Sequence, residues 1–203
     1  MAPSSLIAID VAIVPPPAVW QQAIELSAAL PEAESLGLRL DAERMPHVTL
    51  TQQFVAAESL DAALEQIGST LAGVAALRLS VTGSGRGHSA VWMAIAPTPA
   101  LIDLHTRLMD GLIPFERPGG TEAAFVGGDA RPGDIAWVAG FRRSSSYAAF
   151  TPHITLGHAS TPPAVEPLTF DATTIAACHL GRFCTCRRVL RQWESMETRP
   201  SRV

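Results

Sequence analysis

The chain has 203 residues, of which 47% are hydrophobic and 17% are charged. This composition excludes an intrinsically disordered chain, and the length allows a globular core. The formal net charge of −4 excludes a histone-like polyanion-binding protein, and all 15 basic residues are arginine, so the chain offers no lysine nucleophile, Schiff-base lysine or P-loop lysine.

Strands and helices alternate in the first part of the predicted fold. Leu6–Val14 is apolar and β-branched, as expected for a buried strand, and three prolines end it. Apolar residues recur with helical spacing over Pro17–Leu30 and again over Ser59–Gly73. His47–Phe54, which lies between these helices, is typical of a strand.

A hairpin and a helix are predicted next. Leu77–Thr82 alternates between apolar and polar residues, and a glycine-rich turn over Gly83–Gly87 leads to a second strand, Ala90–Ala96. Thr98 is a predicted N-cap, and Pro99 then occupies the first position of a leucine-lined helix.

The second half begins with an aperiodic segment. Pro114–Gly133 is rich in glycine and proline and is expected to be a long connecting loop or insertion, followed by a short helix over Asp134–Arg143. Three strands are predicted to close the chain: His153–His158, Thr169–Leu180 and Phe183–Trp193, the last two joined at Gly181-Arg182. This mixed order with hairpins predicts an α+β fold and not a doubly wound parallel sheet.

One short sequence occurs twice. Met45–Leu50 reads Met-Pro-His-Val-Thr-Leu, and Thr151–Leu156 reads Thr-Pro-His-Ile-Thr-Leu. Chance gives about 0.04 His-x-Thr-Leu sequences in a chain of this composition, so two copies indicate a shared role.

The spacing within each copy has a structural meaning. Residues i and i+2 of a strand project to the same face, so His47 projects with Thr49 and His153 with Thr155. If the fold brings the two strands together, one site contains two imidazoles and two hydroxyls.

Such a site suits phosphodiester hydrolysis without a metal. An imidazole titrates near pH 6.5, so one ring can accept a proton from water while the other donates a proton to the leaving oxygen. Threonine hydroxyls can donate hydrogen bonds to the non-bridging phosphate oxygens.

The chain resembles the two-histidine (2H) phosphoesterase superfamily. This family includes 2′-5′ RNA ligases, RNA 2′,3′-cyclic phosphodiesterases and plant-type cyclic nucleotide phosphodiesterases, and it is defined by two His-x-(Thr/Ser)-apolar motifs, which residues 47–50 and 153–156 match. The resemblance covers about residues 5–194, including Val91–Ile95 with the helix after it, Phe150–Gly157 and the final strands. The segment 114–133 departs from it, because it lengthens the gap between the motifs.

The resemblance implies one domain over residues 1–203, with two pseudo-symmetric lobes, each a sheet with helices, and the site between them. It implies cofactor-free and metal-free hydrolysis of a 2′,3′-cyclic phosphate to a 2′-phosphate, with His153 as the base and His47 as the acid. The expected substrate is a cyclic nucleotide or an RNA terminus. The alternatives are a 2′-5′ oligonucleotide phosphodiesterase or RNA ligase, an ADP-ribose cyclic phosphate phosphodiesterase, and a non-catalytic RNA-binding module.

Several other residues are candidates for the site. The residues expected to bind substrate are Arg142, Arg143, Tyr147, Phe150 and Arg187, with Arg182 and Arg188 as further arginines. Trp92 can stack a base or pack in the core. His158 is expected to face away from His153, whereas His88 and His105 are expected at the surface.

No metal site is expected from the three cysteines. The spacing of Cys178, His179, Cys184 and Cys186 fits no usual structural zinc site, and the favoured interpretation is a set of buried thiols. An odd number of cysteines also argues against a disulfide framework. We therefore expect a cytoplasmic monomer without a signal peptide, without a membrane span and without affinity for long duplex nucleic acid.

Overall fold

A computed structural model describes residues 5–195 of the chain, which form one nine-stranded antiparallel sheet with four α-helices. The strands are β1 (Leu6–Val14), β2 (Val48–Ala56), β3 (Leu77–Arg86), β4 (Ala90–Ile95), β5 (Glu116–Arg117), β6 (His153–His158), β7 (Leu168–Ala172), β8 (Thr174–Leu180) and β9 (Cys186–Glu194). The helices are α1 (Pro17–Ala28), α2 (Leu60–Leu71), α3 (Pro99–Gly111) and α4 (Pro132–Ser144). The predicted α+β class is confirmed.

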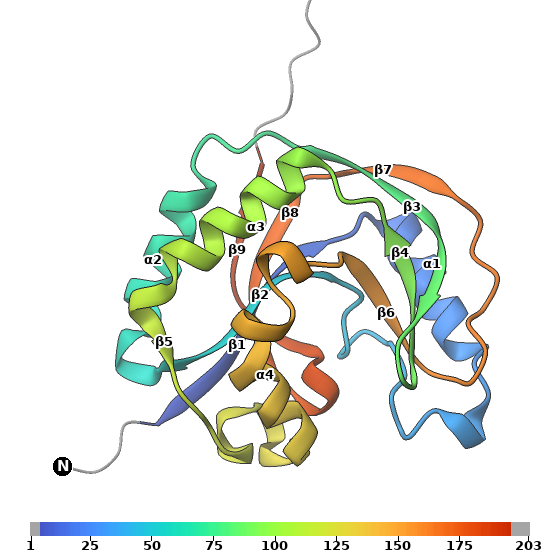
Figure 1. The fold of residues 1–203 in the computed structure, drawn as a ribbon, viewed down its shortest axis with the longest axis horizontal. Coiled ribbons are helices and arrows are strands. Elements are labelled where there is room, and N and C mark those ends of the chain that lie inside the picture. The colour runs from blue at the N-terminus through green and yellow to red at the C-terminus, as the bar shows by residue number, and fades with distance from the viewer. Residues whose placement is uncertain (1–4, 196–203) are drawn as a thin grey trace, which may run out of the picture.

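The sheet curls strongly. Its strand order is β7-β3-β4-β6-β2-β1-β8-β9, with β5 paired to β2 beside this path. Only Thr173 separates β7 from β8, although β7 pairs with β3 and β8 pairs with β1 in the other half of the sheet (Figure 1). The prediction of one strand over Thr169–Leu180 was therefore wrong, because its two parts pair with different neighbours.

The two motif strands meet at the middle of the sheet. Strands β2 and β6 are joined by one antiparallel residue pair, Val48 with Ile154. On one side of this junction lie β6, β4, β3 and β7, and on the other lie β2, β1, β8 and β9. The sheet is continuous through the junction, and a division into two lobes stays a prediction.

Helices cover one face of each half and build the main core. Helix α1 packs against β6, whereas α2 and α3 contact each other and pack on β2 (Figure 1). The buried residues of α2 recur at helical spacing: Ala63, Leu64, Ile67 and Leu71. Each large apolar side chain buried in this way contributes about 1.5–3 kcal/mol to folding. Within residues 5–195, no helix is both long enough and apolar enough to cross a membrane.

Two of the three glycines in the predicted turn, Gly83 and Gly85, lie in strand β3 instead. Strand β3 continues to Arg86 and pairs with β4 from Gly83 to Arg86, so the turn begins only at Gly87. A Cβ atom on Gly85 would lie 2.2 Å from Nε1 of Trp92, so the missing side chain makes room for the indole. Gly87 lies under the same ring, where a Cβ atom would lie 3.3 Å from it.

The segment 114–133 is more ordered than the predicted loop. It contains β5 and short 3₁₀ turns, and its Phe125 is buried edge-on against Phe54 with the ring centroids 5.8 Å apart. Gly120 approaches the same Phe54 ring so closely that a Cβ atom would lie 2.5 Å from it. This packing joins the segment to a second apolar cluster, which lies beside α4 and includes Val138.

Candidate active site

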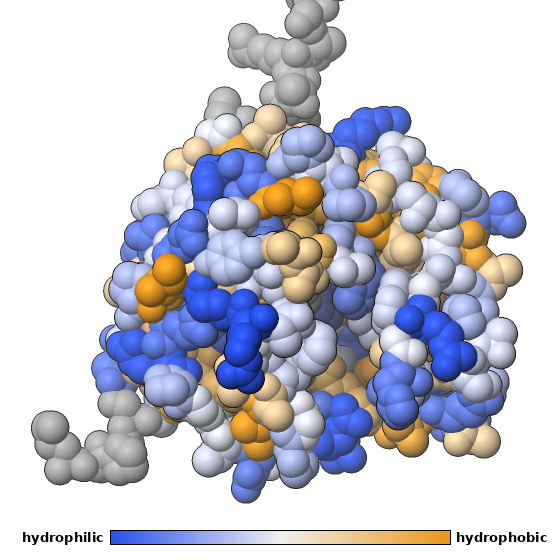
Figure 2. Space-filling view, viewed as in Figure 1, coloured by the Kyte–Doolittle hydropathy of each residue, from blue (hydrophilic) through white to orange (hydrophobic). Residues whose placement is uncertain are grey.

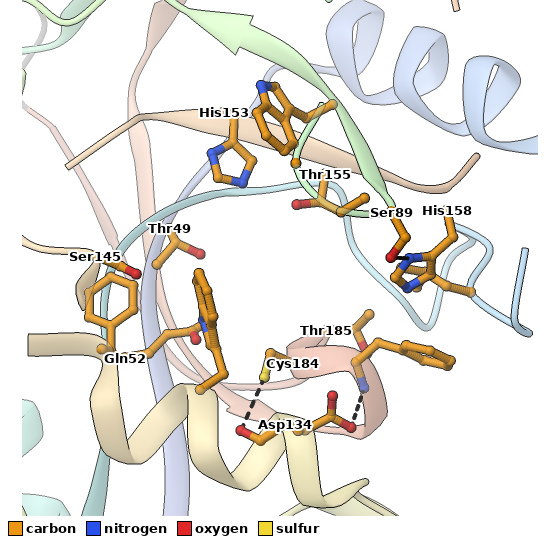
Figure 3. Close-up of a pocket in the computed structure, with 18 of the residues that line it drawn as sticks. Thr49, Gln52, Ser89, Asp134, Ser145, His153, Thr155, His158, Cys184 and Thr185 are labelled. Carbon is orange, nitrogen blue, oxygen red and sulfur yellow. Dashed lines mark hydrogen bonds between the residues drawn. The ribbon is translucent and has the colours of Figure 1, made fainter. Parts of the chain in front are cut away.

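The two motifs line one cavity of about 810 Å³. His47 and Thr49 come from one motif, and His153 and Thr155 from the other, as the sequence predicted. Figure 2 shows that this face of the molecule is hollowed near its centre. In Figure 3, Thr49 and the second motif's His153 and Thr155 lie around the same space.

Both catalytic candidates have the same ring orientation. Nδ1 of His47 lies 2.7 Å from the carbonyl oxygen of Met45, and Nδ1 of His153 lies 2.7 Å from that of Thr151. A carbonyl oxygen only accepts, so Nδ1 carries the hydrogen in both rings. Nε2 of each ring is therefore left for proton transfer.

The proline shared by the motifs precedes each histidine. Pro46 and Pro152 restrict the residue before them to extended backbone, and that residue carries the carbonyl that binds the ring. The proline is thus part of the device that orients each imidazole.

Both motif strands contain a β-bulge at the motif leucine. Leu50 has no cross-strand partner on β1, although the residues on either side of it are paired. Leu156 likewise has no cross-strand partner on β4. The carbonyl oxygens of both leucines accept hydrogen bonds of 2.6 Å from buried side chains, His105 of α3 for Leu50 and Ser27 of α1 for Leu156. The helices on the two halves therefore fix equivalent irregularities in the sheet.

The bulges shift the alternation of the strands by one residue. As a result Gln52 and His158, each five positions after its motif histidine, also line the cavity. The prediction that His158 faces away from His153 was wrong for this reason. Nδ1 of His158 lies 3.0 Å from Oγ of Ser89, a hydrogen bond drawn in Figure 3.

His105 is a structural residue and not the surface residue predicted. It is fully buried, and its Nε2 accepts a hydrogen bond of 2.8 Å from the backbone N–H of Tyr147. Its ring stacks on Phe150 with a centroid distance of 3.9 Å. Burial lowers the pKa of His105, in agreement with a neutral ring that donates through Nδ1 and accepts through Nε2.

Asp10 of β1 was not predicted as a site residue. Its carboxylate is buried and accepts hydrogen bonds from Thr49 Oγ1 and Gln52 Nε2, while Nε2 of His47 lies 3.7 Å away. Burial raises the pKa of Asp10, and the His47 imidazole opposes that effect. The signal in the sequence is one acidic residue in an otherwise apolar strand.

The surroundings of His153 are less polar than those of His47. The Trp92 indole lies against its ring, with 4.8 Å between centroids. Burial lowers the pKa of His153, with a smaller contribution from the nearby His47. A neutral ring, able to accept a proton, is therefore favoured at this position.

Helix α4 forms a further wall that the sequence did not predict. Arg131, Asp134, Trp137 and Phe141 line the cavity from this helix and its N-cap. Trp137 is 47% exposed although it is a large apolar residue, and its ring lies edge-on against Phe141.

The N-terminal end of α4 also fixes the turn before β9. Asp134 binds the Arg131 guanidinium and accepts a hydrogen bond of 3.0 Å from the backbone N–H of Phe183. The Arg131 guanidinium lies 3.8 Å from the centroid of the Phe183 ring. Phe183 and Cys184 both have positive φ, 63° and 53°, and both line the cavity. These contacts maintain a backbone conformation that is uncommon for such residues.

Most of the residues predicted to bind substrate lie outside the cavity lining. Of that set only Phe150 lines the cavity; Arg142, Arg143, Tyr147 and Arg187 do not. Arg142 binds Glu116, the Tyr147 hydroxyl and a backbone carbonyl of α3, and Arg187 binds Glu43. Arg182 and Arg188 are also absent from the cavity lining.

The donor atoms present do not favour a resident metal. Nε2 of His179 is hydrogen-bonded to the carbonyl of Ala124, so the predicted cysteine-rich hairpin offers no open histidine. Ligand atoms of Asp10, His47 and Cys186 lie within 4.8 Å of one another. However, burial raises the pKa of the Cys186 thiol well above its usual range, so the sulfur stays protonated and is a poor metal ligand.

Comparison with known proteins agrees with the fold and the motifs. E. coli LigT complexed with NADP+ is 22% identical to the chain, with a TM-score of 0.60 over 94% of this chain and 99% of LigT. A crystal structure titled as a phosphoesterase is 22% identical, with a TM-score of 0.58 over 96% of this chain and 99% of that chain. TT0787 of Thermus thermophilus is 14% identical, with a TM-score of 0.56 over 95% of this chain and 100% of its own. At these identities the likeness shows a shared fold.

A search of curated proteins gives no significant match. The family model of the 2′-5′ RNA ligase superfamily matches residues 15–180, which include both motifs and the strands that carry them. The chain belongs to the 2′-5′ RNA ligase superfamily, the 2H phosphoesterases.

Proposed function

We propose that the protein is a metal-independent phosphodiesterase that hydrolyses 2′,3′-cyclic phosphates of small nucleotides or RNA ends to 2′-phosphates. The observation that carries this proposal is that both motif histidines keep Nδ1 on a backbone carbonyl and leave Nε2 for the same cavity. Two such rings provide an acid and a base without any further group.

The groups around the two histidines differ, so that one ring suits the base and the other suits the acid. His153 lies against Trp92 and has a lowered pKa because of burial, so it suits the base that takes a proton from water. His47 lies 3.7 Å from a carboxylate, Asp10, which attracts a positively charged ring and suits the acid.

The reaction follows from this assignment. A water oxygen attacks phosphorus while His153 Nε2 takes one of its protons, the P–O3′ bond breaks, and His47 Nε2 donates a proton to O3′. The product is a 2′-phosphate, and a proton passes from His153 back to His47 through solvent before the next turnover. The Thr155 hydroxyl lines the cavity and has no hydrogen-bond partner among the described residues, so it can donate to a non-bridging oxygen where charge builds up.

Thr49 has a different role in this scheme. Its single hydroxyl hydrogen is donated to Asp10, so in this state its oxygen is an acceptor toward the cavity. The two threonines, equivalent in sequence, are therefore not equivalent in the site.

The cavity has room for a nucleotide. Its volume of about 810 Å³ lies within the range of roughly 300–1,000 Å³ that is common for small-molecule sites. The exposed Trp137 indole provides a face on which a base can stack. E. coli LigT structures complexed with NADP+, 3′-AMP and ATP show that a protein of this fold binds nucleotides.

RNA ligation through a 2′-5′ bond is the second candidate, favoured by the description of the matching family. It is the reverse of transesterification at the same phosphorus, so the same two histidines serve it. Because the chain has no lysine, ligation here would not use a lysyl-nucleotide intermediate.

The test is turnover in the presence of EDTA. The four nucleoside 2′,3′-cyclic phosphates and a cyclic-phosphate-ended RNA are the substrates, and a 3′,5′-cyclic nucleotide is the matched control. We expect hydrolysis of at least one 2′,3′-cyclic substrate to a 2′-phosphate and none of the control. No turnover of any 2′,3′-cyclic substrate would refute the proposal, and joining of 2′,3′-cyclic-phosphate and 5′-hydroxyl ends into a 2′-5′ bond without such hydrolysis would favour the ligase.

A further inference from the structure

Asp10 connects three side chains of one half of the site. Its Oδ2 accepts hydrogen bonds from Thr49 Oγ1 at 2.8 Å and from Gln52 Nε2 at 2.7 Å, and it lies 3.7 Å from Nε2 of His47. All three partners line the cavity, whereas Asp10 itself is fully buried behind them. The carboxylate therefore lies one layer below the groups that face the substrate.

The buried carboxylate depends on His47 for charge compensation. Among the described residues its Oδ1 has no hydrogen-bond partner, and its ion-pair partner is His47. A buried carboxylate is stable as an anion only when a positive charge and hydrogen bonds compensate it. Each charge in this pair consequently favours the other.

The other half of the site lacks such a group. Asp10 is the cross-strand partner of Gln52, five residues after His47, and Ala90 is the partner of His158, five residues after His153. Alanine thus stands where the first half has a carboxylate.

The neighbour of His153 is apolar instead of acidic. Trp92 packs against its ring at 4.8 Å. The site is consequently built from two equivalent motifs but is asymmetric in the groups behind them.

We propose that Asp10 is a positioning residue that makes the His47 half of the site the proton-donating half. The inference rests on the proposed acid–base function and assigns which histidine is the acid. The 3.7 Å between the carboxylate and Nε2 exceeds a hydrogen bond. The charged ring is therefore attracted by Asp10, while its Nε2 proton stays available to the leaving oxygen.

The other titratable groups around Asp10 do not take over this role. The thiols of Cys184 and Cys186 have pKa values that burial raises well above the usual range, so both stay neutral. Cys178 is the cross-strand partner of Asp10 on β8 and carries no positive charge. His153 faces His47 from β6 and interacts with it electrostatically, but within residues 5–195 His153 forms no ion pair with Asp10.

The decisive variant is Asp10→Asn, which keeps the size of the side chain and an oxygen for Thr49 but removes the charge. We expect kcat to fall by about 10- to 100-fold, part of the 10²–10⁴-fold that a general acid contributes, while KM changes by less than about threefold. The alkaline limb of the pH profile should move down, because the charged His47 ring loses its counter-ion. Asp171→Asn, at an exposed aspartate of β7 that pairs with Arg78, is the control and should change neither quantity.

A second measurement needs neither turnover nor the variant. Nuclear magnetic resonance of the wild-type protein, with labelled histidine rings and aspartate carboxyls, follows His47 and Asp10 through a pH titration. We expect the two signals to change together, since they share one electrostatic pair. An Asp10→Asn protein with an unchanged pH profile, or a His47 ring that titrates without any response at Asp10, would overturn the proposal. A protein without cyclic phosphodiesterase activity but with this coupling would contradict the proposed function alone.

Discussion

Val48 and Ile154, the residues that follow the two motif histidines, are direct cross-strand partners in the centre of the sheet. An antiparallel pair has an approximate local two-fold axis, so this contact relates the two motifs by that axis. The residues before and after the pair, His47 with Thr49 and His153 with Thr155, project away from the core on the same face. A single backbone pairing thus explains why two distant segments form one cavity.

The pH dependence of the reaction should reflect the low pKa of His153. Because burial lowers that pKa, the ring stays neutral and competent as a base at pH values below its usual 6.5. We predict that the acid limb of kcat/KM lies below about pH 6.5, which a profile of the free enzyme measures directly. Trp92→Ala, which exposes the ring to water, should move this limb upward. An acid limb above 6.5 in the wild-type protein would contradict the assignment of His153 as the base.

Trp137 should contribute to substrate affinity and not to chemistry. Stacking of a base on an aromatic ring is worth about 1–3 kcal/mol, so Trp137→Ala is expected to raise KM about 5- to 150-fold with little change in kcat. Trp137→Phe should retain most of the affinity. Trp20 of α1 is not part of the cavity lining, which makes Trp20→Ala a suitable control. Steady-state kinetics with one cyclic nucleotide suffices, and a KM within twofold of wild type for Trp137→Ala would exclude stacking on this ring.

His105 should contribute a pH-dependent part of the stability. His105→Phe keeps the stacking on Phe150 but leaves the Leu50 carbonyl and the Tyr147 N–H unpaired, which costs about 1–3 kcal/mol for each buried group. Because the folded pKa of His105 is lowered from 6.5, its contribution is present above pH 6.5 and is lost as pH falls through the folded value.

Urea unfolding at pH 7.5 and pH 5.5 measures this effect. We expect the stability difference between wild type and His105→Phe to be smaller at the lower pH. The same difference at both pH values would show that the ring is not a neutral buried group.

The repeated motif allowed the centre of the site to be predicted from sequence, because strand alternation places His and Thr on one face whatever surrounds them. The same alternation rule gives the wrong face for residues that follow the motifs. It cannot detect the bulges at Leu50 and Leu156, whose carbonyl oxygens accept hydrogen bonds from the distant side chains of His105 and Ser27, respectively. His158 was consequently assigned to the wrong face.

Residues whose role depends on tertiary partners were also missed or misplaced. Asp10 lies in an apolar strand, and only the fold shows that its carboxylate reaches His47. Trp137 lies in the helix predicted over Asp134–Arg143, but only the fold shows that this helix lines the cavity. Arg142 is attractive as a phosphate ligand in the sequence, but Glu116 engages its guanidinium in the fold.

In the proposed mechanism His47 and His153 act together on one phosphate. The most direct test compares kcat for adenosine 2′,3′-cyclic phosphate, in EDTA, among wild type, His47→Ala, His153→Ala and the double variant. Groups that act as a unit give non-additive losses, so each single substitution should lower kcat by about 10²-fold or more and the double variant should be no slower than the slower single one. A near-normal rate in either single variant, or losses that multiply in the double variant, would contradict the two-histidine mechanism.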